Sequence, residues 1–458
     1  MNLLWKSFLH LLCLGRDLPV VNGAVNETDM TFLVMSDLHD FTPFAYKKTL
    51  EDIKQMNLWE ASKAALSAIK ATYGGELVLI PGDSASFGKI SNEVIKKELG
   101  KPGYSMNEVV YEATSNVYKA VKAMYNEVGY DTVLAAVGDH EIGGNKGFKA
   151  GKKSKVSTVP SYRKGFSDGY SSDADGNFLF TKKIGNADSR PLGTIWESTS
   201  YAYVQNNCLF ITIDAFKSMG DDKNYIDRKK GRGGEGTITC DVDGKHLEWF
   251  EEVLVEAGND DTIQHIFVQA HLPIIQPVRK VHSSGQFMDN ADESTFWQVM
   301  NKHKVDVYFA GDVHSNTASV ARDPKSEVVQ VVSRGNPFNN FLQVETTPTS
   351  IDITLLNEVG FLPTWNLKYE EYGKVSIDKS LAKRSITSSG ELKLLNPDAE
   401  LIRFDFEEMP PLGTRQVRFA EDYCVLLIEL WAKTNIQTFN KLCFINESLI
   451  LLFFLSGT

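Results

Sequence analysis

The chain has 458 residues, of which 42% are hydrophobic and 23% charged, and its formal net charge is -11 at pH 7. This length provides for one large α/β domain with insertions, or for two domains, with a sizeable buried core. The acidic balance would repel nucleic-acid phosphates, and no lysine-rich or arginine-rich helix offsets it, which argues against a nucleic-acid binder. The five cysteines show no C-x-x-C or zinc-finger spacing, which excludes a cysteine-based metal site. Cys208 and Cys240 either pair in an oxidising compartment or are thiols of the core.

Residues 1–23 have the composition of a signal peptide. Lys6 precedes an apolar run from Phe8 to Leu14, and small residues follow at Gly23 and Ala24. The run is too short to span a bilayer. Asn26-Glu27-Thr28 is a glycosylation sequon. We therefore expect a glycoprotein that is secreted or resident in the endomembrane lumen, without a firm membrane anchor.

Short apolar runs alternate with helix-like stretches from Thr31 onward, a pattern typical of an α/β sheet with helices on its faces. The predicted strands are 31–36, 76–81, 131–137, 201–204, 209–214, 263–269, 305–309, 328–332, 341–345 and 351–355. The predicted helices are 46–72, 107–128, 246–257 and 295–303. We expect one core domain over residues 29–356.

Two segments depart from this alternation. Residues 144–192 are rich in Gly, Ser, Lys and Asp, which predicts a long insertion without regular structure. It forms either a lid or wall for a substrate, or a disordered surface segment. Residues 357–458 carry no motif and are expected to be a C-terminal extension of unknown structure, whose apolar end is too short for a transmembrane helix.

Asp or His directly follows five of the predicted hydrophobic strands. These positions are Asp37-Leu38-His39, Gly82-Asp83, Gly138-Asp139-His140-Glu141, His271-Leu272-Pro273 and Gly311-Asp312-Val313-His314. Strand ends of open α/β sheets face one crevice, where ligands bind. Asp-x-His places two side chains on one side of an extended segment, and a preceding Gly lets the backbone approach an ion closely. Each motif alone is usually structural, but all five in this order indicate a metal site.

In this order the motifs resemble the calcineurin-like metallophosphoesterase superfamily, whose pattern is Asp-x-His, Gly-Asp, Gly-Asn-His-Asp/Glu, a lone His and Gly-His-x-His. The resemblance implies an α/β fold, a four-layer sandwich of two central mixed β-sheets flanked by helices. It also implies hydrolysis of a small phosphorylated substrate, a phosphate monoester or diester. Two metal ions would bind the phosphate oxygens and generate a metal-bound hydroxide as nucleophile.

The resemblance also assigns roles to residues at the matching positions. The first metal ion would be bound by Asp37, His39 and His314. Asp83 would bridge both ions. The second ion would be bound by Asp139, His271 and Asp312. His140 would protonate the leaving oxygen or hold the phosphate, with Glu141 as its orienting partner. The remaining histidines outside the leader are expected to be structural or solvated: His246, His265, His282 and His303.

Two positions depart from the family pattern. Asp139 stands where the family usually has Asn, and Asp312 where it usually has the first His of Gly-His-x-His. Both changes add carboxylate oxygen donors and negative charge. We therefore expect two divalent or mixed-valence ions, with Mn, Fe or Ca favoured over the softer Zn. The changes also motivate an alternative, in which the protein is a degenerate family member that acts as a non-catalytic binding scaffold. The retention of His140 argues against this alternative.

Overall fold

The computed structural model describes residues 30–38, 49–55, 57–84, 105–138, 152–173, 175–218, 226–227, 232–233, 238–240, 242–275, 294–312, 316–323, 325–333, 335, 340–358, 368–396, 443–445 and 448–450. The predicted signal peptide and the sequon at Asn26 lie outside these residues. No helix in these ranges combines the length and the apolar character needed to cross a membrane.

The first of two large sheets has seven strands in the order β17-β16-β15-β14-β1-β2-β3. They are β1 (Met30–Val34), β2 (Leu77–Ile80), β3 (Thr132–Ala135), β14 (Asn340–Thr347), β15 (Ser350–Glu358), β16 (Tyr369–Asp378) and β17 (Ser385–Gly390). β1, β2 and β3 run parallel, and β14 is antiparallel to β1. The carboxyl ends of the three parallel strands therefore meet at one edge of the sheet.

The second large sheet also has seven strands, in the order β18-β12-β13-β11-β10-β5-β4. They are β4 (Tyr201–Gln205), β5 (Cys208–Thr212), β10 (His265–Gln269), β11 (Val307–Ala310), β12 (Thr317–Val320), β13 (Val329–Val332) and β18 (Leu394–Leu395). β5, β10, β11 and β13 run parallel. Short pairs of strands lie outside both sheets: β6 (Phe216–Ser218) with β9 (Ile238–Cys240), β7 (Ile226–Asp227) with β8 (Arg232–Gly233), and β19 (Cys443–Ile445) with β20 (Ser448–Ile450).

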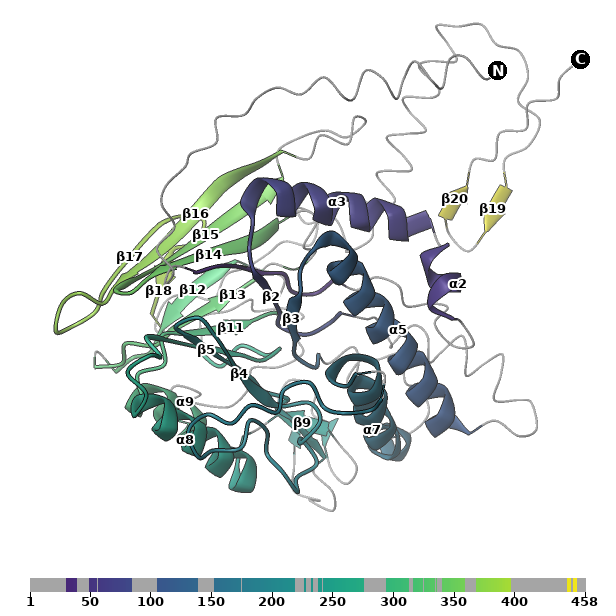
Figure 1. Cartoon of the computed structure of the whole chain (residues 1–458), viewed down its shortest axis with the longest axis horizontal. Coiled ribbons are helices and arrows are strands. Elements are labelled where there is room, and N and C mark those ends of the chain that lie inside the picture. The colour runs from purple at the N-terminus through teal and green to yellow at the C-terminus, as the bar shows by residue number, and fades with distance from the viewer. Residues whose placement is uncertain are drawn as a thin grey trace, which may run out of the picture.

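The two sheets pack face to face, with helices on their outer sides (Figure 1). The ring of Phe32 in β1 lies 5.1 Å from that of Phe210 and 4.9 Å from that of Phe267, both in the second sheet. The helices are α2 (Leu50–Lys54), α3 (Asn57–Tyr73), α5 (Met106–Val128), α7 (Lys152–Phe166), α8 (Gly244–Gly258) and α9 (Thr295–Lys302). α3 and α5 cover the first sheet, and α8 and α9 cover the second. The predicted four-layer α/β sandwich is confirmed.

The segment 144–192 contains regular structure. α7 continues into the π-helical turn η1 (Ser167–Ser171), and both pack against α5. Tyr162, Phe166 and Tyr170 recur every four residues and are buried. A Cβ on Gly169 would lie 2.5 Å from a main-chain oxygen of α5, so this glycine permits the close helix contact. The prediction of an insertion without regular structure is therefore wrong for residues 152–173, because its polar composition concealed an aromatic stripe at helical spacing.

The two sheets continue beyond Leu356, the residue at which we predicted the core domain to end. β16 pairs with β15, and β17 with β16, so both extend the first sheet. β18 pairs with β12 and extends the second sheet. β16 mixes buried and exposed residues, β17 is mostly exposed, and neither has a continuous apolar run, which is why the sequence gives little signal for them.

Cys208 is a free thiol, fully buried in β5. Burial raises the pKa of this thiol to about 12, so it is neutral and unreactive at physiological pH. Of the two alternatives for Cys208, a disulfide or a core thiol, the second is confirmed.

Candidate metal centre

Four of the predicted site residues are described, and each lies two or three residues after the end of a parallel strand. Asp37 and Asp83 follow β1 and β2 of the first sheet, whereas His271 and Asp312 follow β10 and β11 of the second. Main-chain hydrogen bonds hold each pair together: Asp37 N donates to Gly82 O at 3.2 Å, and Gly311 N donates to His271 O at 2.8 Å. The sandwich therefore brings the carboxyl ends of both sheets to one place.

A hydrogen bond joins the two halves of the site. Asp312 N, from the second sheet, donates to Asp37 Oδ1, from the first, over 3.2 Å. Ser36 Oγ donates to the other oxygen of the same carboxylate, Asp37 Oδ2. Asp37 is fully buried, and these donors fix the direction of its carboxylate.

The side chains converge as a metal site requires. Ligand atoms of Asp37, Asp83 and His271 all lie within 4.8 Å of one another, and all three residues are buried. His271 Nε2 lies 3.4 Å from Asp83 Oδ2 and 3.9 Å from Asp312 Oδ1. Carboxylates and an imidazole from four separate strands therefore surround one small volume.

The main chain sets the orientation of the His271 ring. Its Nδ1 lies 2.9 Å from Pro81 O, and a carbonyl oxygen can only accept, so Nδ1 carries the proton. In the neutral ring Nε2 then presents a lone pair toward the carboxylates of Asp83 and Asp312. This is the tautomer and orientation that a metal-binding histidine needs.

The backbone is strained at the same positions. Non-glycine residues with positive φ number five in the described part of the chain, and three of them are Asp37 (φ 55), Asp83 (φ 52) and Asp312 (φ 64). The left-handed conformation costs a non-glycine residue about 1–2 kcal/mol. Strain gathered at a cluster of carboxylates is typical of functional sites rather than of ordinary turns.

Glycines make room for the cluster. A Cβ on Gly82 (φ 84) would lie 2.5 Å from His271 Nδ1, and one on Gly311 would lie 2.5 Å from Asp37 Oδ2. A Cβ on Gly335 (φ 81) would lie 2.8 Å from Asp37 Cβ. The motifs indicated Gly82 and Gly311, but sequence reasoning missed Gly335, whose signal is its place just after β13, another parallel strand.

The residues present fit divalent cations. Three buried carboxylates and an imidazole lone pair converge, and oxygen and nitrogen donors of this kind are ligands for divalent cations. In the described part of the chain, the buried hydroxyls of Ser84 and Ser333, which follow β2 and β13, have no hydrogen-bond partner. Unsatisfied buried groups at the strand ends are consistent with a ligand there.

The other predicted site residues lie outside the described residues: His39, Asp139, His140, Glu141 and His314. Asp139 and His140 directly follow Gly138, just beyond β3, which is the neighbour of β2 in the first sheet. His39 and His314 come two residues after Asp37 and Asp312. Their roles stay predictions.

Sequence reasoning missed the role of Asp214, which lies next to the centre. Thr212 in β5 pairs with Gln269 in β10, so Asp214 occupies the position that matches His271 on the neighbouring strand. Arg163 Nε from α7 lies 2.8 Å from Asp214 Oδ2, and Thr199 Oγ1 lies 2.7 Å from the same oxygen. These bonds make Asp214 an anchor for α7 rather than a candidate ligand. Its signal in the sequence is that it also follows a hydrophobic strand by two residues.

Three further histidines are structural, as expected. The His246 ring is fully buried and stacks on Trp196 at 4.6 Å, and its Nε2 lies 3.0 Å from Ser200 Oγ. Burial lowers the pKa of His246 and of His265 to about 4, so both rings are neutral near pH 7. His303 lies 3.2 Å from Glu251. His282 lies outside the described residues.

Comparison with known proteins supports one assignment. The solved structures that resemble this fold include PhoD, which is 12% identical over 82% of this chain and 75% of that chain, with a TM-score of 0.47. The purple acid phosphatase PPD1 from yellow lupin seeds is 12% identical over 77% of this chain and 54% of that chain, with a TM-score of 0.41. A third is GAP50, the anchor in the inner membrane complex of Plasmodium, which is 10% identical over 84% of this chain and 100% of that chain, with a TM-score of 0.38. No curated protein matches the sequence. Residues 30–316 match the profile of the calcineurin-like phosphoesterases, so the chain belongs to the calcineurin-like phosphoesterase family.

Proposed function

We propose that the protein is a metal-dependent hydrolase of phosphate esters that works with two metal ions. The observation that carries the proposal is the convergence of Asp37, Asp83 and His271, buried and within 4.8 Å of one another, at the strand ends of both sheets. When bound, the metal ions supply an activated water as nucleophile and offset the charge that develops on the phosphoryl oxygens. Membership of the family supports this function.

The ligands divide between two metal positions. We assign the first position to Asp37, His39 and His314, the bridge to Asp83, and the second position to Asp139, His271 and Asp312. Within this set, Pro81 O holds the His271 ring so that Nε2 faces the centre. The Asp312 amide in turn holds the carboxylate of Asp37. These contacts orient the ligands before any ion binds, which lowers the cost of assembling the site.

His140 and Glu141 carry the proton chemistry of the proposal. We assign to His140 the protonation of the leaving oxygen or the grip on the phosphate, and to Glu141 the orientation of its ring. A well-placed general acid contributes about 10²–10⁴ to the rate. Both residues follow β3, and β3 is the neighbour of β2, the strand that carries Asp83.

The ligand set favours hard cations. Four of the seven proposed ligands are carboxylates, and oxygen donors suit Mn, Fe or Ca better than Zn. We therefore propose that the active protein holds two divalent or mixed-valence ions of this kind. Protein that is fully active with zinc as its dominant metal would contradict this assignment.

The substrate class is a small phosphorylated molecule, either a monoester or a diester. The net charge of -11 disfavours nucleic acid as a partner. The signal-like residues 1–23 and the sequon at Asn26 support a secreted or endomembrane glycoprotein, and the apolar run in the leader is too short for a firm membrane anchor.

The test is hydrolysis of p-nitrophenyl phosphate and bis-p-nitrophenyl phosphate by protein stripped of metal and resupplied separately with Mn, Fe, Ca, Mg or Zn. We expect activity with at least one metal, lost by about 10³-fold or more in Asp83→Asn. Asp261→Asn, an exposed carboxylate in the turn before β10, at the opposite end of this strand from His271, serves as the matched control and should keep full activity. The ester that is hydrolysed faster separates a monoesterase from a diesterase.

The alternative, in which the protein is a non-catalytic scaffold, predicts a different result in the same hydrolysis assay. Folded protein that binds metal but hydrolyses neither ester with any of the five metals would favour it. Metal-dependent turnover that disappears in Asp83→Asn would discard it.

A further inference from the structure

A cavity of about 200 Å³ lies away from the candidate metal centre. It is lined by the C-terminal half of α5, the start of β3, Tyr170 of η1, Leu179 and Phe180, and Tyr203 of β4. The described candidate ligands Asp37, Asp83, His271 and Asp312 follow the carboxyl ends of their strands, whereas this cavity opens at the start of β3, and none of these four residues lines it. It is therefore a separate site.

The floor of the cavity is rigid. Tyr170 is 2% exposed, and its hydroxyl donates to Val133 O on the free edge of β3. The Phe180 ring stacks on Tyr201 with centroids 4.1 Å apart and planes at 5°. Walls that are already ordered lower the entropy cost of holding a ligand.

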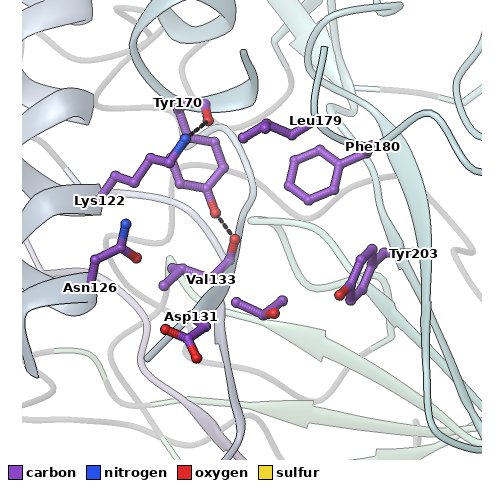
Figure 2. A pocket seen from close by; sticks show the side chains of 9 residues that line it. Lys122, Asn126, Asp131, Val133, Tyr170, Leu179, Phe180 and Tyr203 are labelled. Carbon is purple, nitrogen blue, oxygen red and sulfur yellow. Dashed lines mark hydrogen bonds between the residues drawn. The ribbon is translucent and has the colours of Figure 1, made fainter. Parts of the chain in front are cut away.

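Lys122 places a positive charge at one side of the cavity (Figure 2). Its Nζ lies 3.2 Å from Tyr170 O and 3.5 Å from Ser172 O, two neutral acceptors, and an ammonium has three donors. Among the described residues, no carboxylate lies within 4.0 Å of this ammonium. Burial lowers the pKa of Lys122, and the negative charge of Asp173 offsets only part of this effect. An anion in the cavity would accept the remaining hydrogen bond of the Lys122 ammonium and balance its charge.

The opposite wall is mainly apolar and aromatic. Figure 2 shows the rings of Phe180 and Tyr203 across the cavity from Lys122, with Leu179 beside them. The two rings meet edge to face at 5.9 Å, and Leu179 is 44% exposed. An exposed leucine beside two aromatic rings offers a surface for an apolar body. At the rim, the exposed carboxylate of Asp131 can accept a hydrogen bond and disfavours a second negative charge.

We propose that this cavity binds a small organic monoanion with a flat apolar body, of the class of the aromatic carboxylates. The carboxylate pairs with the Lys122 ammonium, and the ring lies against Leu179, Phe180 and Tyr203. A hydroxyl at the far end of such a ligand donates to Asp131. The size of the cavity limits the ligand to roughly a dozen non-hydrogen atoms.

The probe for the test is 4-hydroxyphenylacetate, titrated into the full-length protein and followed by ligand-observed NMR. We expect saturable binding with a dissociation constant on the order of 1 mM, as suits a ligand of this size. The neutral amide analogue, 4-hydroxyphenylacetamide, should bind at least 10-fold more weakly. Lys122→Met keeps the aliphatic stem and removes the charge, and should weaken binding of the anion at least 10-fold without changing that of the amide.

The controls separate this site from others. Lys119→Met removes an exposed charge one turn earlier on α5 and should leave binding unchanged. Asp83→Asn should also leave it unchanged, so the result does not depend on the metal centre. Leu179→Asp, at an exposed position that folding tolerates, should abolish anion binding. No saturable binding, equal binding by Lys122→Met, or loss of binding in Asp83→Asn would each overturn the proposal.

Discussion

Lys379 Nζ lies 2.9 Å from Asp306 Oδ1, although Lys379 follows β16 of the first sheet and Asp306 precedes β11 of the second. Arg384 Nη2 lies 2.8 Å from the same oxygen, and Ile266 N donates to Asp306 Oδ2 at 2.8 Å. The Asp306 side chain is 1% exposed. The segment between β16 and β17 thus supplies both cations for a buried carboxylate of the other sheet, which ties the C-terminal strands to the sandwich.

A chain shortened to end after Leu356 should therefore fold poorly. It would lose β16, β17 and β18 and would leave the buried charge of Asp306 without its cations, which costs about 3–5 kcal/mol. That is a large part of the 5–15 kcal/mol by which domains are typically stable. Urea denaturation should show a much lower midpoint than in a chain that ends after Asn396. Equal midpoints would instead support a domain boundary at Leu356.

Gly335→Ala should disturb the metal centre. The substitution strains a backbone at φ 81 and pushes a Cβ to 2.8 Å from Asp37 Cβ. We expect loss of most metal-dependent hydrolysis, because Asp37 cannot keep its position beside Asp83. Initial rates at saturating metal measure the effect.

Gly193→Ala is the matched control for this change. Gly193 has a similar φ of 71, and nothing lies within 4 Å of a Cβ there, so only the backbone cost of about 1–2 kcal/mol should appear. Activity should be unchanged. Equal losses in both variants would show that Gly335 acts through general stability and not through Asp37.

The strands that build the core could be predicted from the sequence because they are buried on both faces and form continuous apolar runs. The same runs predicted that Asp37, Asp83, His271 and Asp312 gather at the strand ends. The helix predicted over 46–72 is two helices, α2 and α3, which the apolar periodicity does not separate. β16 and β17 escaped prediction because β16 alternates buried with exposed residues and β17 is mostly exposed.

The finer parts of the site depend on contacts between segments that are distant in sequence. The bond from His271 to Pro81 O, the approach of Gly335 to Asp37, and the pair of Arg163 with Asp214 each join different strands or helices. Their residue types are common in turns and surfaces, so no local pattern marks them. Only the tertiary packing of the sheets and of α7 brings them together.

His246 should make the protein less stable in mild acid. Burial lowers the pKa of His246 from 6.5 to about 4, with Asp214 and Arg163 acting in opposite directions. Below pH 6.5 the unfolded chain therefore binds a proton that the folded protein does not, so the free energy of unfolding falls as the pH falls toward 4. His246→Gln should flatten this dependence by up to about 1.4 kcal/mol per pH unit. Chemical denaturation at pH 7 and pH 5 gives the slopes, and parallel slopes for the two proteins would contradict the assignment.

The buried pair of Arg163 and Asp214 should behave unlike a surface ion pair. Their side chains are 7% and 0% exposed, so Arg163→Met would leave a buried charge unpaired and cost about 3–5 kcal/mol. The double variant Arg163→Met with Asp214→Leu removes both charges and should recover most of the loss. The exposed pair of Lys368 and Glu370 is the control, and Lys368→Met should not change the urea midpoint. A double variant as unstable as the single one would show that the hydrogen bonds, not the charge balance, matter.

Metal should stabilise the fold through the same carboxylates that we assign to catalysis. Asp83 lies 3.4 Å from His271 Nε2 in a buried cluster of candidate ligands, and an ion that binds there only in the folded state adds its binding free energy to stability. At a metal concentration 100 times the dissociation constant this amounts to about 2.7 kcal/mol. The midpoint temperature of thermal unfolding of the metal-free protein should rise on addition of Mn, and a chelator should reverse this rise. Asp83→Asn removes one proposed ligand, so it should gain less stability from Mn than the wild type. If Asp83→Asn gains as much from Mn as the wild type, the ion binds elsewhere.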